Sequence, residues 1–156
     1  YIGRLSRRFD FDYINLGFSG NAKGEQSMMD YIAGLDLGMF VYDYDYNAPT
    51  VEHLAATHFP GYLTVRWAHP DIPIIMASRP NFDSPHEDGQ ARRDVIAASY
   101  ERAKAEGDRN VYFVDGAKVF RTFFADGCTV DGCHPNDLGF FRMAEAFGAV
   151  MENIFQ

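Results

Sequence analysis

Short apolar runs and longer amphipathic stretches alternate along this chain of 156 residues. The short runs are mostly apolar at consecutive positions, a pattern typical of strands buried on both faces of a parallel sheet. The longer stretches place apolar residues at helical spacing. This alternation predicts βαβ units and an α/β fold with helices on both faces of a parallel sheet. The predicted strands are residues 13–16, 39–42, 72–77 and 111–114, and the predicted helices are residues 26–35, 51–68 with a break at Pro60, 90–106 and 137–154.

Two of these helices carry recognisable end signals. Asn136 or Asp137 is expected to cap the last helix, because a short side-chain oxygen there accepts a backbone N–H that has no partner within the helix. Gly107 is expected to stop the helix before it, since glycine readily adopts the left-handed conformation that ends many helices.

The chain opens on apolar residues at helical spacing, so we expect a helix to be under way at residue 1. In a parallel α/β sheet a strand normally precedes such a helix. We therefore expect one domain over residues 1–156 that is incomplete at its N-terminus and lacks its first strand. The residues of this apolar side are Tyr1, Ile2, Leu5 and Phe9.

The charge and composition of the chain exclude some classes of binding partner. The formal net charge of −8 argues against nucleic acid, because phosphate binding needs clustered Lys and Arg. The longest apolar runs are far shorter than the roughly 20 residues of a membrane span. Cys128 and Cys133 have neither the spacing of metal ligands nor that of a disulfide framework. Neither the cellular compartment nor the oligomeric state follows from these features.

The strongest local signal for chemistry is the segment DGCHP at residues 131–135, just before the last predicted helix. His134 suits a general base, because imidazole titrates near neutral pH and can take a proton and later return it. Asp131, three residues earlier, can accept a hydrogen bond from Nδ1–H of that ring and so fix its tautomer. The alternative is a loop in which both side chains only cap the following helix.

Two further candidate segments follow predicted strands, where the carboxyl ends of a parallel sheet collect ligands. In NLGFSGN at residues 15–21 the glycines allow backbone N–H groups to approach a substrate oxygen closely. This is not a nucleophile elbow, because G-x-S-x-G would require glycine where Asn21 stands. In DYNAP at residues 45–49, Asn47 is a neutral donor that suits an oxyanion hole. The alternative for Asn47 is a turn asparagine before a helix.

Together the segments INLGFSGN, YDYNAP and DGCHPNDLGF resemble the second, third and fifth sequence blocks of the SGNH/GDSL hydrolases. The resemblance runs across nearly the whole chain and is nearest to the GDSL-like branch whose second block reads GFSGN. It implies a flavodoxin-like, three-layer α/β/α sandwich and a Ser–His–Asp triad. In that family the oxyanion hole combines the serine N–H, a glycine N–H of the second block and an asparagine side chain of the third.

Position by position, the resemblance implies that Gly20 and Asn47 belong to the oxyanion hole, that Asp131 orients the base and that His134 is the base. The family's first block, a GDS- or GSS-type motif that holds the nucleophilic serine, has no counterpart here. We therefore expect the nucleophile to lie outside this sequence. The alternative within the family is that Ser19 has become the nucleophile.

The sequence thus predicts a serine esterase or acylhydrolase that cleaves carboxylic esters through an acyl-enzyme. The resemblance suggests short acyl groups, including acetyl esters of sugars or glycans, as the substrate class. One alternative is a catalytically silent domain that keeps a carbohydrate- or ester-binding cleft. In such a domain Tyr44 and Tyr46 either stack on a sugar ring or belong to the core. Another is a flavodoxin-like mononucleotide binder, which shares the fold class.

Neither a cofactor nor a metal is predicted. The sequence has no Gly-rich nucleotide-binding motif. The histidines outside the DGCHP segment lack a convincing set of partner ligands and are interpreted as structural or exposed. They are His53, His58, His69 and His86.

Overall fold

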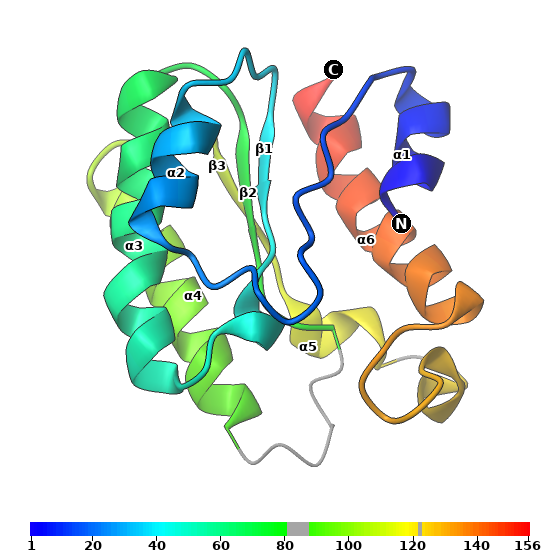
Figure 1. The fold of residues 1–156 in the computed structure, drawn as a ribbon. Helices are drawn as coiled ribbons and strands as arrows, with labels where there is room; N and C mark the ends of the chain where they lie inside the picture. The colour runs from blue at the N-terminus through cyan, green and yellow to red at the C-terminus, as the bar shows by residue number, and fades with distance from the viewer. Residues whose placement is uncertain (81–87, 122) are drawn as a thin grey trace.

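The computed structural model describes residues 1–80, 88–121 and 123–156. In this part of the chain three strands form a parallel sheet in the order β1-β2-β3. Figure 1 shows this sheet between two layers of helices, which confirms the predicted α/β fold. The strands are β1 (Phe40–Tyr42), β2 (Ile74–Ala77) and β3 (Val111–Val114).

The helices divide between the two faces of the sheet (Figure 1). One layer holds α2 (Gln26–Ala33), α3 (Val51–Ala68) and α4 (Gly89–Ala105). The other holds α1 (Ile2–Phe9) and α6 (Asp137–Ile154). No element that was predicted and found differs in its bounds by more than two residues. Shorter elements that were not predicted are η1 (Asp45–Asn47), α5 (Gly116–Val119) and η2 (Ala125–Cys128).

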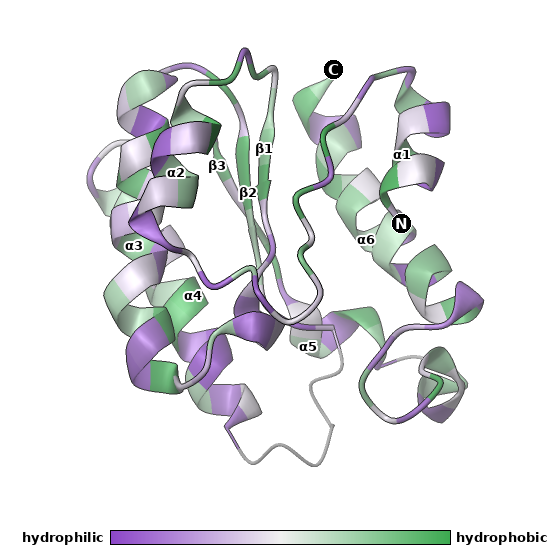
Figure 2. Ribbon diagram, in the orientation of Figure 1, coloured by the Kyte–Doolittle hydropathy of each residue, from purple (hydrophilic) through white to green (hydrophobic). Residues whose placement is uncertain are grey.

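Strand β2 supplies both halves of the core, because successive side chains of a strand point to opposite faces. Ile74 and Met76 pack in the cluster beneath α2, α3 and α4, whereas Ile75 and Ala77 pack in the cluster against α6. All four are buried. Figure 2 shows the strands mainly in the hydrophobic colour. Helices cover both faces of this sheet, so its strands are apolar at consecutive positions and do not alternate.

Residues 13–16 do not form the predicted strand. Tyr13 and Ile14 are 46% and 60% exposed. A strand exists only where a neighbour pairs with its backbone, and no described strand pairs with this segment. Among the described residues β1 likewise has a strand partner on one side only. Apolar residues alone were therefore an insufficient signal here.

The predicted break at Pro60 is also wrong, since α3 runs without interruption over 18 residues. Proline removes one backbone hydrogen bond from a helix. Buried residues on both sides of it, such as Leu54 and Tyr62, hold both halves of α3 against the core. Packing thus outweighs the local cost of the proline.

The predicted end signals are confirmed. Asn136 caps α6, and its Oδ1 accepts the N–H of Gly139 at 3.1 Å. Gly107 follows α4 with φ of 98°, a left-handed conformation in which its N–H bonds the carbonyl of Lys104. The apolar residues at the start of the chain do form a helix, α1.

Candidate functional site

Two of the candidate residues belong to segments next to the carboxyl end of a strand or the start of a helix. The turn η1 with Asn47 follows β1, Arg79 follows β2, and the loop of residues 129–135 precedes α6. Burial and the charge of Asp131 raise the pKa of Cys133, and the charge of Arg79 opposes them. Oδ2 of Asp45 in η1 accepts the backbone N–H of Arg79 at 2.9 Å, which joins the ends of β1 and β2, and Arg79 is also within electrostatic range of this loop.

The loop that carries His134 is closed at its base. Thr129 and Pro135 form an isolated antiparallel bridge, and the N–H of Val130 bonds the carbonyl of His134 at 2.9 Å. Gly132 turns the chain between them with φ of 82°, a conformation that favours glycine. A short hairpin-like loop thus presents residues 131–134 at the N-terminus of α6.

Asp131 and His134 are in direct contact. Oδ2 of Asp131 lies 2.7 Å from Nδ1 of His134, and Oδ1 accepts the backbone N–H groups of His134 at 2.7 Å and Cys133 at 2.9 Å. These bonds, first of all the one from the backbone of His134, lower the pKa of Asp131 to about 2. The carboxylate is therefore ionised at neutral pH and accepts the proton of Nδ1, which places the lone pair of the ring on Nε2.

The imidazole of this pair faces solvent. The side chains of His134 and Asp131 are 76% and 49% exposed. No described residue bonds Nε2 of His134. An aspartate-oriented imidazole with an accessible Nε2 can accept a proton from a hydroxyl group that approaches it.

Asn47 lies at the last position of η1. Its backbone N–H bonds the carbonyl of Tyr44 at 2.9 Å, and its half-buried side chain makes no hydrogen bond with the described residues. An amide held by its backbone and unengaged at its side chain can donate to an incoming oxygen.

Gly20 and Ser19 occupy an exposed turn that the N–H of Asn21 closes onto the carbonyl of Phe18. Gly20 has φ of 69°, and a Cβ at this position would meet no neighbouring atom. Glycine is therefore favoured here by the backbone conformation and not by a lack of space for a side chain. No hydrogen bond among the described residues joins Gly20, Ser19 or Asn47 to His134.

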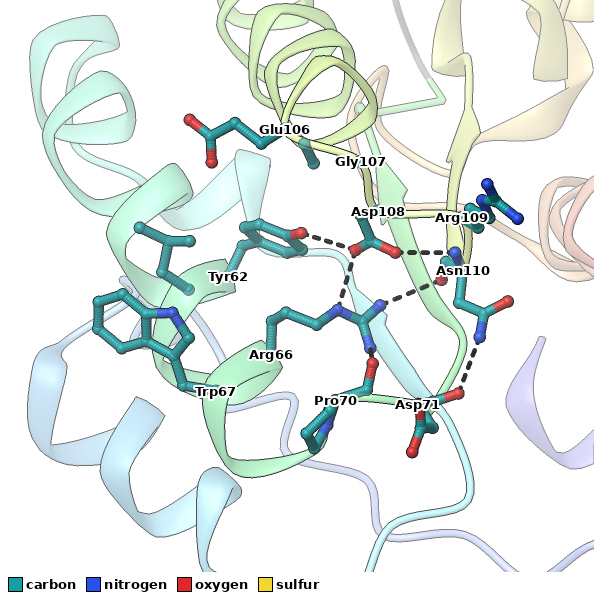
Figure 3. Close-up of a pocket in the computed structure, with 12 residues that line it drawn as sticks. Tyr62, Arg66, Trp67, Pro70, Asp71, Glu106, Gly107, Asp108, Arg109 and Asn110 are labelled. Carbon is teal, nitrogen blue, oxygen red and sulfur yellow. Dashed lines mark hydrogen bonds and ion pairs between the residues drawn. The ribbon is translucent and has the colours of Figure 1, made fainter.

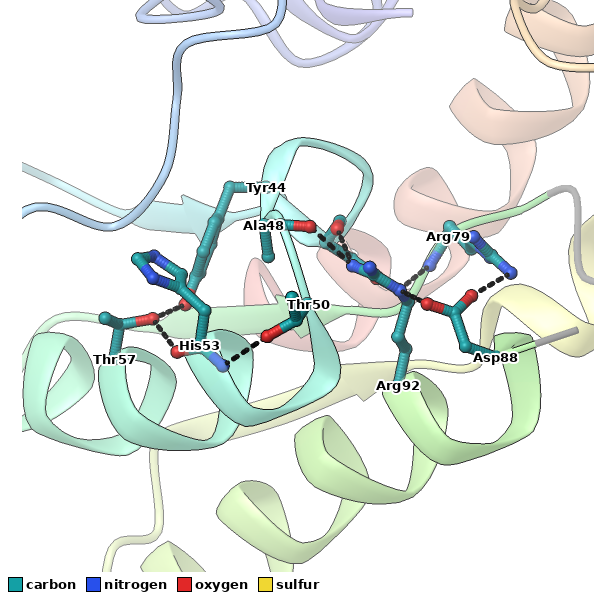
Figure 4. A network of polar contacts seen from close by, with 9 residues as sticks. Tyr44, Ala48, Thr50, His53, Thr57, Arg79, Asp88 and Arg92 are labelled. Carbon is teal, nitrogen blue, oxygen red and sulfur yellow. Dashed lines mark hydrogen bonds and ion pairs between the residues drawn. The ribbon is translucent and has the colours of Figure 1, made fainter. Parts of the chain in front are cut away.

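Sequence reasoning missed a network of buried charges beside Asn47, shown in Figure 4. Arg92 of α4 reaches the turn η1, and Asp45 of that turn reaches the end of β2. A signal was present in the sequence, because Arg92 shares the buried stripe of α4 with Ile96, Ser99 and Ala103. An arginine on the apolar side of a helix indicates a buried acceptor.

The sugar-stacking role suggested for Tyr44 does not fit the structure. Tyr44 is buried, its ring stacks on Tyr42 at 4.9 Å between centroids, and its hydroxyl lies 2.7 Å from Oγ1 of Thr57. It therefore belongs to the core. The ring of Tyr46 lies 5.6 Å from the guanidinium of Arg79.

The other histidines have structural surroundings. Nε2 of His53 lies 2.8 Å from the carbonyl of Lys23, and Nε2 of His69 lies 3.0 Å from that of Ala33. His58 is fully buried. His86 lies outside the described residues. Across residues 1–80, 88–121 and 123–156 no three His, Cys, Asp or Glu side chains group as metal ligands, and no helix there has the length and apolar character needed to cross a membrane.

A shallow hollow of about 530 Å³ lies at the opposite end of the sheet, where β2 and β3 begin (Figure 3). Its floor is organised by Arg66, whose Nε donates to Asp108 at 2.9 Å and whose Nη atoms donate to backbone carbonyls at 2.7 to 3.2 Å. Arg66 thus links the loops that precede β2 and β3. Those carbonyls belong to His69, Pro70, Ile72 and Asn110.

Comparison with known proteins places the chain in a family. Residues 1–152 match the model of the GDSL-like Lipase/Acylhydrolase family. A crystal structure described as a GDSL-like lipase from Bacteroides ovatus ATCC 8483 is 31% identical, with a TM-score of 0.85 over 97% of this chain and 46% of its own. The salicylyl acyltransferase SsfX3 of a tetracycline biosynthetic pathway shares the fold, at 20% identity and a TM-score of 0.79 over 96% of this chain and 47% of its own.

This chain therefore spans about half the length of both structures. No curated protein matches it. The family match extends over residues 1–152, nearly the whole chain, and this match decides its classification. The chain belongs to the GDSL-like lipase/acylhydrolase family.

Proposed function

We propose that this chain carries the acid–base half of the active site of a serine ester hydrolase. The observation that supports this most is the contact of 2.7 Å between Asp131 and Nδ1 of His134, with Nε2 open to solvent. In the reaction a serine hydroxyl attacks the ester carbonyl while Nε2 of His134 takes its proton. The same proton then passes to the leaving alcohol as the acyl-enzyme forms, and water repeats the sequence to release the acid.

Asn47 and the N–H of Gly20 are proposed to stabilise the oxyanion of the tetrahedral intermediate. Both follow from the resemblance to the second and third family blocks, and the unengaged side-chain amide of Asn47 supports its part. The acting serine is proposed to lie outside residues 1–156, in a first block that this sequence does not contain. The proposed substrates are esters of short acyl groups, including acetyl esters of sugars or glycans.

The test uses the full-length protein that contains this chain. Turnover of p-nitrophenyl acetate is measured, and the serine that a fluorophosphonate probe labels is located by mass spectrometry. His134→Ala should abolish turnover, whereas the matched control His53→Ala on α3 should keep it. Label on a serine outside residues 1–156 supports the proposal.

Two results would contradict it in different ways. Label on Ser19 would show that the nucleophile lies within this chain and would overturn the block assignment. Absence of both turnover and label in a folded protein would instead favour a silent domain that only binds its ligand.

A further inference from the structure

The turn that holds Asn47 is fastened by one side chain from a distant helix. Nη1 of Arg92 donates to the backbone carbonyls of Asp45 and Ala48, each at 2.9 Å. These two residues flank Asn47 in the chain, one two positions before it and the other directly after it. Arg92 therefore grips the η1 turn on both sides of the asparagine (Figure 4).

Arg92 and Asp45 each make a further hydrogen bond that fixes the η1 turn to another element. Nε of Arg92 donates to Oδ2 of Asp88 at 2.5 Å, at the N-terminus of the same helix. Oδ2 of Asp45 accepts the backbone N–H of Arg79 at 2.9 Å, which ties the turn to the end of β2. The turn after β1, the end of β2 and the start of α4 thus form one connected frame.

This frame is dry. The side chains of Arg92 and Asp45 are 8% and 1% exposed, and Nη1 of Arg92 lies 3.6 Å from Oδ1 of Asp45. Burial raises the pKa of Asp45, and the N–H of Arg79 and the charges of Arg79 and Arg92 oppose that rise. Oδ1 of Asp45 has no hydrogen bond to a described residue, so the charge of Arg92 is what compensates it. Moving either partner would leave a buried charge without compensation.

Asn47 depends on this frame because its side chain has no hydrogen bond of its own to a described residue. The backbone of η1 sets the position of its Cβ and therefore the region that its amide can reach. Oxyanion donors must sit within hydrogen-bond distance of an atom that becomes charged only in the transition state. A shift of about 1 Å in such a group costs about 10²-fold in rate.

We propose that Arg92 is the positioning residue that sets the place of the Asn47 amide for oxyanion stabilisation. This inference rests on the proposed function, in which Asn47 is an oxyanion donor. Arg92 touches no reacting atom in this role. It acts through the carbonyls of Asp45 and Ala48.

A double-mutant cycle in the full-length protein tests it, with Arg92→Lys, Asn47→Ala and the double variant. Lysine keeps the charge, but it cannot hold Asp88 and both carbonyls at once, because it lacks the planar fork of arginine. Arg92→Lys should lower kcat by about tenfold or more with KM within about twofold. In the Asn47→Ala background the same change should cost less than about threefold, because the group that it positions is already gone.

The matched control is Arg93→Lys on the same helix. Arg93 also makes a two-pronged pair, with Asp115 at 2.7 Å for both bonds, yet it does not touch η1. The Arg93→Lys variant should keep the wild-type kcat. Asp88→Asn, which loosens Arg92 without removing it, should give a smaller kcat loss with the same dependence on Asn47 and serves if Arg92→Lys does not fold.

Three results would overturn the inference. An unchanged kcat in a folded Arg92→Lys variant would leave Arg92 with a stabilising role only. Equal losses with and without Asn47 would show that Arg92 acts elsewhere. If Asn47→Ala alone leaves kcat unchanged, the oxyanion assignment of the proposed function is what fails, and the role of Arg92 falls with it.

Discussion

Asp131 holds His134 at two points, its backbone N–H through Oδ1 and its ring through Oδ2, both at 2.7 Å. The proposed orienting acid and the proposed base are therefore fixed to one another within four consecutive residues. Their geometry does not depend on packing elsewhere, because both side chains are exposed. Substitutions in this pair should change the chemistry and leave the fold intact.

Asp131→Asn in the full-length protein should lower kcat for ester hydrolysis by about 10³ to 10⁴. The amide cannot stabilise the imidazolium by charge, and it favours the wrong tautomer of the ring. The thermal midpoint should stay close to that of the wild type, since Asp131 is exposed. Asp137→Asn, an exposed acid in the first turn of α6, is the control. Ordinary turnover by Asp131→Asn would remove Asp131 from the triad.

Asn47→Ala should lower kcat by about 10² to 10³ and leave KM nearly unchanged, because an oxyanion donor acts mainly in the transition state. The measurement is steady-state kinetics on p-nitrophenyl acetate. Asn153→Ala, at an exposed position near the end of α6, should have no effect on either constant. A change in KM alone would assign Asn47 to substrate binding.

His58 should make the fold less stable in mild acid than a variant without this histidine. This residue is fully buried against Tyr42, with 4.7 Å between ring centroids, and burial lowers its pKa to about 3. The unfolded chain takes up the proton near pH 6.5, whereas the folded chain does not. Its contribution to stability is therefore complete above about pH 6.5 and declines as the pH falls towards 3, by at most about 1.4 kcal/mol per pH unit.

Urea unfolding between pH 7.5 and pH 4.5 measures this slope. His58→Phe, which keeps an aromatic ring in place, should lose less stability than the wild type between these two pH values. Tyr42→Phe keeps the histidine and should leave the slope as in the wild type. An equally steep slope in His58→Phe would place the acid sensitivity elsewhere, for instance outside the core. Asp43 acts in the opposite direction, because burial raises its pKa to about 6 and its protonation favours the folded state as the pH falls.

Gly116→Ala should destabilise the fold by about 3 kcal/mol or more. A Cβ at this position would overlap the backbone carbonyl oxygens of Ser78 and Arg79, neither of which can move aside as a side chain can. Thermal or urea unfolding measures the loss. Gly38→Ala is the control, because a Cβ there meets nothing within 4 Å. A stability equal to the wild type would mean that β2 and α5 separate easily.

The layers of the fold could be predicted because each signal was local. Ile74 to Ala77 are apolar at every position, and the apolar residues of α6 repeat at helical spacing. Residues 13–16 show the limit of such signals. They satisfy the composition of a strand, but a strand also needs a neighbour that lies elsewhere in the chain.

The same distinction separates the parts of the candidate site. Asp131 and His134 are three residues apart, so their contact could be predicted from spacing. The bond between Arg92 and Ala48 joins residues 44 positions apart. The stripe on α4 indicates that Arg92 is buried, but it does not show which carbonyls it meets. Contacts of this range follow from the fold, which a local pattern cannot specify.

Arg66 at the amino end of the sheet and Arg92 at the carboxyl end both donate to backbone carbonyls; those of Arg66 come from two loops, and those of Arg92 from the η1 turn. The two fastenings use separate residues at separate ends. Arg66 and Arg92 can thus be substituted separately. Changes at Arg66 should alter thermal stability, whereas changes at Arg92 should alter kcat together with stability, because Arg92 belongs to a buried ion pair.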